Sequence, residues 1–322
     1  MRWLVVCAFA LVACGDDSSP MTDGGVDAAS SDASFDAPAV DAPAIDSGGS
    51  DAGRDSGMPG DSDHMSYFAP GLTPELATRL VILGDSISAG AGAGRSSLVY
   101  HALLADNDES QWPDEADDDL MSLTGGPVEV LDHSRGGATT RNLRGQTDAA
   151  LDEIGLPASG HTVVVLTIGG NDLQSALIGG DPTGRILDDA IEAIRMMALR
   201  FLDPDDFPDG TSLYLATVYD PSDGEAHVDG CFLDLTLPEF VEALDVWRER
   251  YLALGEEVGF SVVDPLGHFH GHAHNYDNPD NPYYDAEDNT LWFSDCIHPN
   301  TRGHHELRRL FYEAMDPAYV VE

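Results

Sequence analysis

Four short segments of the sequence contain residues of the types that catalyse acyl transfer. They are Gly84-Asp85-Ser86-Ile87-Ser88, Ser134-Arg135-Gly136-Gly137-Ala138-Thr139-Thr140, Gly169-Gly170-Asn171-Asp172 and Asp295-Cys296-Ile297-His298-Pro299-Asn300. A serine hydroxyl is a weak nucleophile until a base takes its proton. A Ser, a His and a carboxylate are therefore useful together only if the fold brings them to one place.

The elements that could position these segments alternate along the chain. Short apolar runs typical of buried strands cover residues 79–83, 127–131, 161–168, 211–218 and 260–263. Stripes of apolar residues at helical spacing cover residues 186–201, 240–251 and 304–315. Five strands alternating with helices predict a parallel sheet with helices on both faces.

Such a sheet would bring the four segments together. Functional sites of open parallel sheets collect at the carboxyl ends of the strands. Three of the segments directly follow the first, second and third predicted strands, and the fourth lies between a long loop and the last helix. We therefore expect a Ser, a Gly, an Asn and an Asp-x-x-His pair at one sheet edge.

The four segments, in this order and at this spacing, resemble the SGNH (GDSL) hydrolase family over about residues 77–316. The resemblance implies a three-layer α/β/α sandwich with a five-stranded parallel sheet, of the flavodoxin-like type. It also implies hydrolysis of carboxylic esters, by an acyl or acetyl esterase or a lipase, without an organic cofactor. An α/β-hydrolase fits less well, because Ser88 stands where its Gly-x-Ser-x-Gly elbow has a second Gly.

The resemblance assigns the catalytic residues. Ser86 would be the nucleophile that forms the acyl-enzyme, and His298 the base that later protonates the leaving group. Asp295 lies three residues before His298, so one turn of loop can bring its carboxylate to the imidazole, where it would fix the tautomer and stabilise the imidazolium. No metal is part of this set.

The same family pattern supplies an oxyanion hole and its supports. The expected donors are the backbone N–H groups of Ser86 and Gly137 and the side-chain amide of Asn171. Gly136 is adjacent to Gly137 and stays an alternative, although the spacing to Thr139 favours Gly137. Asp85 and Asp172 are expected to hold the loops in place.

The N-terminal residues predict export. Residues 1–13 have the positive and apolar regions of a signal peptide and end before Cys14, which resembles a bacterial lipoprotein processing box. Residues 14–65 would be the lipidated Cys14 and a disordered tether, because this part consists mostly of Asp, Ser, Ala, Gly and Pro. Residues 66–322 would form the hydrolase domain. We expect an extracytoplasmic protein that is lipid-anchored to a bacterial membrane, the outer membrane or cell surface.

Charge limits the partners. The chain has 322 residues with 58 Asp and Glu against 15 Arg and no Lys, a formal charge of −43. So acidic a chain is repelled by phosphate backbones, which excludes nucleic acid as a partner and disfavours anionic substrates. The expected partners are the membrane, through the anchor, and a small-molecule, lipid or acylated-carbohydrate ester. We expect a monomer.

Two further features leave alternatives open. Cys231 and Cys296 remain after export and lipidation, and they form either a disulfide, which we expect, or two free thiols. His268, His270, His272 and His274 alternate, as a metal site in an extended segment would, although a polar loop at the mouth of the site is favoured. Residues 265–294 are long enough for a lid or substrate wall. Two other functions stay possible: a catalytically silent surface-binding lipoprotein and a His-rich metal-binding surface protein.

Overall fold

The structure, a computed structural model, describes residues 66–228, 231, 238–316 and 318–319 of the chain. All of these fall within one compact unit. The predicted signal peptide, Cys14 and the predicted tether lie outside the described residues, and their division from the hydrolase domain stays a prediction. No helix among the described residues is long and apolar enough to cross a bilayer.

The centre of the fold is a parallel sheet of five strands. Its strands are β1 (Ala77–Gly84), β2 (Glu129–Asp132), β3 (His161–Thr167), β4 (Thr211–Ala216) and β5 (Ser261–Val263). They pair in the order β2-β1-β3-β4-β5. The predicted α/β fold with a five-stranded parallel sheet is confirmed, and each strand lies within about two residues of its expected place.

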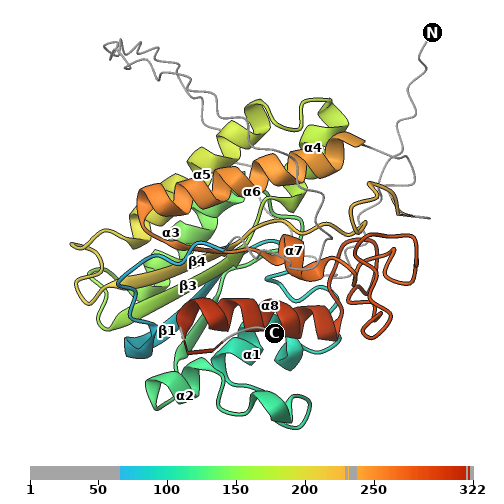
Figure 1. The fold of residues 1–322 in the computed structure, drawn as a ribbon. Coiled ribbons are helices and arrows are strands. Elements are labelled where there is room, and N and C mark those ends of the chain that lie inside the picture. The colour runs from blue at the N-terminus through green and yellow to red at the C-terminus, as the bar shows by residue number, and fades with distance from the viewer. Residues whose placement is uncertain (1–65, 229–230, 232–237, 317, 320–322) are drawn as a thin grey trace, which may run out of the picture. The chain divides into compact units, whose positions relative to one another are not determined.

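Helices cover both faces of the sheet (Figure 1). One layer contains α3 (Leu143–Ile154), α4 (Gly170–Gly179), α5 (Arg185–Phe201) and α6 (Pro238–Val258), and the other contains α1 (Tyr100–Ala105), α2 (Leu120–Thr124) and α8 (Thr301–Met315). The short helix α7 (Pro265–Phe269) follows β5. Alternate side chains of β1 enter the two cores: Val81 and Leu83 pack under the first layer, Leu80 and Ile82 under the second.

The long amphipathic helices were predictable and the short ones were not. The apolar stripes of α5, α6 and α8 are buried against the sheet, as their spacing indicates. Helix α8 begins three residues earlier than its stripe, because the Asn300 side chain caps it by accepting from the N–H groups of Arg302 and Gly303. Helix α4 begins inside the Gly-Gly-Asn-Asp segment, where polar residues hide the pattern.

The end of β1 is fixed by a side chain from α3. The amide of Gln146 accepts a hydrogen bond from Gly84 N and donates one to Gly84 O, each at 2.8 Å. Gly84 has φ +119°, and a Cβ there would lie 2.2 Å from the carbonyl oxygen of Thr167. Only glycine allows β1 and β3 to approach this closely where the chain turns toward Ser86.

We predict that Gln146→Leu lowers the free energy of unfolding by about 2 kcal/mol, because the buried N–H of Gly84 loses its acceptor. Gln146→Glu keeps an acceptor for that N–H and should lose less when both are measured by urea unfolding near pH 5. Equal stability of Gln146→Leu and the wild type would show that this double hydrogen bond does not hold the strand end.

Candidate active site

The four polar segments meet at the carboxyl edge of the sheet. Ser86 follows β1, the Arg135–Ala138 turn follows β2, Asn171 lies in the first turn of α4 after β3, and His298 precedes α8. Neighbouring parallel strands end at the same edge, so residues distant in sequence become adjacent. The expected placement of the four segments is therefore what the structure shows.

Ser86, His298 and Asp295 form a continuous hydrogen-bonded relay. The Ser86 Oγ lies 2.9 Å from His298 Nε2, and His298 Nδ1 lies 2.8 Å from Asp295 Oδ2. With Nδ1–H donating to the carboxylate, Nε2 is free to accept the serine proton. This is the geometry required of a nucleophile, a base and a group that orients the base.

Asp295 also organises the turn that contains His298. Its Oδ1 accepts from the backbone N–H groups of Ile297, at 3.0 Å, and His298, at 2.9 Å. Burial alone would raise the pKa of Asp295, but these hydrogen bonds and the imidazole hold it below its usual value. The carboxylate is therefore ionised at neutral pH and can stabilise an imidazolium.

The loop after β2 is hydrogen-bonded to the end of β1 and to the first turn of α4. Arg135 N donates to Gly84 O at 3.1 Å, and Asn171 Nδ2 donates to Ala138 O at 2.9 Å. One amide proton of Asn171 is thus used to hold the loop, and no described residue accepts the other in a hydrogen bond. Among the described residues, none accepts a hydrogen bond from the backbone N–H of Ser86, Gly136 or Gly137.

Asp172 connects this loop to α4. Its carboxylate accepts from Thr140 N at 2.9 Å and from Thr140 Oγ1 at 2.8 Å. Burial raises the pKa of Asp172, and the hydrogen bonds from Thr140 oppose that rise. The carboxylate therefore ties the Thr140 end of this loop to the first turn of α4.

Asp85 supports the turn that presents Ser86. Its Oδ1 accepts from Ile87 N at 3.1 Å and from Thr167 Oγ1 at 3.0 Å. Burial raises the pKa of Asp85 to about 6. Thr167 continues into a chain of hydroxyls, because Ser88 Oγ lies 2.9 Å from Thr167 Oγ1 and 2.8 Å from Tyr100 OH. The sequence did not predict these contacts of Thr167 and Ser88, because threonine and serine are common at strand ends and in turns.

A cavity of about 780 Å³, including its open mouth, adjoins the relay. Ser86, Asn171 and His298 line it together with apolar side chains from the ends of β3 and β4 and from α4 and α6. These apolar side chains include Ile168, Leu173, Leu177, Val218 and Phe240. The reacting group of a bound substrate would thus lie between a nucleophile and an apolar recess.

The expected disulfide is confirmed. Cys231 and Cys296 are bonded, with their Cα atoms 5.7 Å apart. Cys296 lies between Asp295 and His298, so the bond attaches the Asp295–His298 turn to the segment after β4. Tyr219, which sequence reasoning missed, also reaches this turn, because its hydroxyl donates to the carbonyl of Ile297.

The alternating histidines do not converge. Their ring nitrogens face four different groups: His268 meets Glu306, His270 meets Asp220, His272 meets the Thr290 carbonyl and His274 meets the Asp295 carbonyl. Among the described residues, no group of three or more His, Cys, Asp or Glu side chains could hold a metal ion. The segment is not extended, since α7 ends at Phe269 and turns follow. Residues 265–294 were expected to form a lid or a substrate wall. The residue of this segment that lines the cavity beside Ser86 is Pro265.

Comparison with protein families agrees with this geometry. The model of the GDSL-like Lipase/Acylhydrolase family matches residues 82–306, which include all four segments. The chain belongs to this family. Membership of this family makes the protein a carboxylic ester hydrolase. The resemblance inferred from the four segments is confirmed. Curated proteins, by contrast, give no significant match.

Several solved structures are similar to this GDSL-like hydrolase at low identity. A gut microbial diltiazem-metabolizing enzyme is 18% identical with a TM-score of 0.50, covering 79% of this chain and 49% of its own. An α/β hydrolase enzyme from the metagenome of Lake Arreo in Spain is 21% identical, with a TM-score of 0.48 and coverage of 76% and 98%. An acetylxylan esterase from Geobacillus stearothermophilus is 17% identical, with a TM-score of 0.45 and coverage of 77% and 99%.

We predict that Asp85 makes stability depend on pH. Its folded pKa of about 6 exceeds the ordinary value, so the folded state holds the proton more tightly than the unfolded chain. This contribution is complete below about pH 4 and is lost as pH rises through about 6. Relative to Asp85→Asn, the wild type should lose up to about 3 kcal/mol of unfolding free energy between pH 4 and pH 8. A difference that does not change with pH would contradict this.

Proposed function

We propose that this protein hydrolyses neutral carboxylic esters with an apolar acyl chain, through an acyl-enzyme on Ser86. The observation that carries the proposal is the relay from Ser86 through His298 to Asp295 at the mouth of an apolar cavity. No step needs a cofactor, because the relay supplies the nucleophile, the base and the acid.

In the acylation half-reaction, His298 Nε2 takes the Ser86 proton while Oγ bonds to the ester carbonyl carbon. The oxyanion formed would be stabilised by N–H groups of Ser86 and Gly137 and by the second amide proton of Asn171. The intermediate collapses when the bond to the alcohol oxygen breaks and the imidazolium gives its proton to that oxygen. Asp295 holds the imidazolium throughout this step.

Deacylation repeats these steps with water as the nucleophile. His298 takes a proton from the water, whose oxygen bonds to the acyl carbon. The new intermediate breaks its bond to Ser86, and the proton on His298 returns to Oγ. A carboxylic acid leaves, and the relay is restored.

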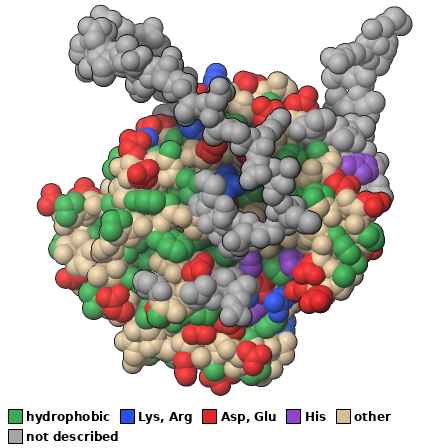
Figure 2. Space-filling view, in the orientation of Figure 1, with side chains coloured by type: hydrophobic (Ala, Val, Ile, Leu, Met, Phe, Trp, Pro, Cys, Tyr) green, Lys and Arg blue, Asp and Glu red, His purple; other side chains and the backbone are tan. Residues whose placement is uncertain are grey.

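The lining of the cavity indicates the substrate. It is largely apolar, and it contains no Arg among its described residues. A carboxylate or phosphate group would find no cation there, and the acidic surface in Figure 2 would repel it at longer range. An acyl chain gains about 0.8 kcal/mol for each buried CH₂ group. These features favour an uncharged ester with several apolar carbons over an acetyl ester.

Export and lipid anchoring belong to the same proposal. Support comes from the signal-like residues 1–13, Cys14 and the polar composition of residues 14–65. The Cys231–Cys296 bond adds to it, because such bonds persist in oxidising compartments. Labelling cells with radioactive palmitate, beside a Cys14→Ala variant, would test the anchor.

The first test is hydrolysis of p-nitrophenyl esters from acetate to decanoate, compared between the wild type and Ser86→Ala. We expect kcat to fall at least about 10⁴-fold in Ser86→Ala, because the remaining donors cannot replace the nucleophile. Circular dichroism would show that the variant folds. Hydrolysis that survives in a folded Ser86→Ala would contradict the proposal, and absence of turnover in both would favour the surface-binding alternative.

The second test fills the cavity. Leu177 lines it, while the next residue, Ile178, is 84% exposed and does not. We expect Leu177→Trp to lower kcat/KM for octanoate by about 10-fold or more and for acetate by less than about 3-fold, because the lost space holds the distal carbons. Ile178→Trp is the matched control. Equal losses for both esters in Leu177→Trp would show that the cavity does not hold the acyl chain.

A further inference from the structure

The catalytic turn lies on an exposed loop, although catalysis requires it to be rigid. The side chain of Asp295 is 55% exposed, and residues 294–300 belong to no helix or long strand. Within the turn, Ser294 N donates to His298 O at 2.9 Å. Local hydrogen bonds of this kind are shared with water at a surface, so other contacts must hold the imidazole against Ser86.

Two side chains donate to the carbonyls on either side of Cys296. His274 Nε2 lies 2.9 Å from the Asp295 carbonyl oxygen, and the Tyr219 hydroxyl donates to the Ile297 carbonyl. Because a carbonyl only accepts, His274 must present Nε2–H in this contact. Together with the disulfide at Cys296, these donors attach three consecutive residues of the turn to the rest of the protein.

Tyr219 is itself held rigidly. Its ring stacks on Phe269 at 5.0 Å and meets the edge of Phe293 at 5.4 Å, and the residue is buried. Burial raises the pKa of its hydroxyl well above the ordinary value, so the proton that it donates is retained at every working pH. Tyr219 thus provides a fixed donor between the sheet and the catalytic turn.

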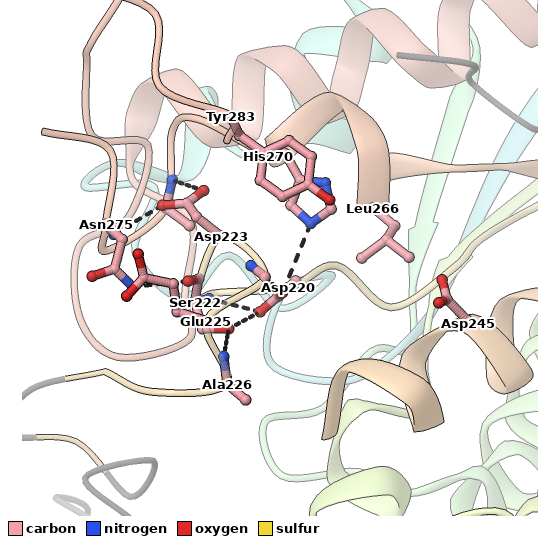
Figure 3. Close-up of polar contacts among 12 residues, drawn as sticks. Asp220, Ser222, Asp223, Glu225, Ala226, Asp245, Leu266, His270, Asn275 and Tyr283 are labelled. Atoms are coloured by element: carbon pink, nitrogen blue, oxygen red, sulfur yellow. Dashed lines mark hydrogen bonds and ion pairs between the residues drawn. The ribbon is translucent and has the colours of Figure 1, made fainter. Parts of the chain in front are cut away.

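His274 is fixed through its backbone by a buried carboxylate. Asp223, which is fully buried, accepts from the N–H groups of Gly271, Ala273 and Asn275 at 2.8, 3.1 and 2.8 Å. Figure 3 shows this carboxylate pointing at the backbone of the 271–275 loop. In addition, His274 N donates to the carbonyl of Pro221 at 3.1 Å. The loop that contains His274 is therefore fastened to the segment that contains Tyr219.

We propose that Tyr219 and His274 are positioning residues that hold the Asp295–His298 turn against Ser86, with Asp223 fixing His274 in place. This inference rests on the proposed function of the relay. Catalysis tolerates little displacement, since a misplacement of about 1 Å can lower a rate about 100-fold. Freeing either carbonyl lets the turn shift, which lengthens the contacts of His298 with Asp295 and Ser86.

The experiment compares two histidines of one loop. His274→Leu removes the donor to Asp295, while His272→Leu removes a similar contact, 3.1 Å from the Thr290 carbonyl, that does not touch the turn. For octanoate hydrolysis by His274→Leu we expect kcat to fall about 10-fold with KM within about 2-fold of the wild type. Tyr219→Phe should act in the same direction, and His274→Gln, which restores an N–H at this reach, should recover most of kcat.

The pH dependence of kcat/KM distinguishes a positioning role of His274 from a role in folding alone. The acid limb of kcat/KM reports protonation of the general base in the free enzyme, and this limb moves when the carboxylate beside the base is displaced. Asp85 and His304 also face His298 electrostatically and are unchanged in these variants. We expect the acid limb of His274→Leu to move to lower pH and that of His272→Leu to stay in place.

Each outcome decides between distinct claims. If His274→Leu and His272→Leu have equal kcat and the same acid limb, the positioning role is wrong even though the esterase is active. A loss in His274→Leu that His274→Gln does not recover would also contradict it. If the wild type neither turns over esters nor reacts at Ser86 with a fluorophosphonate, it is the proposed function that fails.

Discussion

The hydrogen bond between Ser86 and His298 is the contact on which the remainder of the site depends. These residues are 212 positions apart in the chain and meet at 2.9 Å. Nothing local could bring them together. The parallel sheet does so, because β1 delivers Ser86 to the same edge at which the chain returns before α8 (Figure 1). The two helical layers then serve to hold that sheet in one register.

Buried carboxylates do much of the positioning around this contact. Asp85, Asp172 and Asp223 each accept from backbone N–H or hydroxyl groups of a loop at the sheet edge. Burial raises the pKa of all three, so each ionised group is less stable in the fold than in water. Burying these carboxylates lowers the stability of the folded protein, but their hydrogen bonds hold each loop in one conformation. Such a trade is common at functional sites.

Much of this could be read from the sequence. Apolar runs identified the five strands, and strand-end residues of a parallel sheet share an edge, so the four polar segments were expected to meet there. The resemblance of these segments to the SGNH hydrolase family then assigned Ser86, His298 and Asp295. The pairing of Cys231 with Cys296 was also predictable, since few cysteines were available. These inferences depend on pattern and topology, which sequence carries directly.

What sequence could not predict are the single contacts that fasten loops. Gln146, Thr167 and Tyr219 are ordinary types for a helix or a strand end, and only the packed structure shows which carbonyl or N–H each one meets. His274 belonged to a visible pattern, but the alternation suggested four equivalent histidines where the structure has four different partners. The apolar cavity was equally hidden, because its lining comes from elements far apart in sequence.

The most direct test of the account is covalent labelling of the active site. A fluorophosphonate should react with the intact protein and add its mass to Ser86, as located by peptide mass spectrometry. His298→Ala should react far more slowly, because the serine proton then has no acceptor. Labelling of Ser86 in the wild type and its loss in His298→Ala is the predicted result. An unlabelled protein, label on another residue, or equal labelling of both variants would contradict the relay.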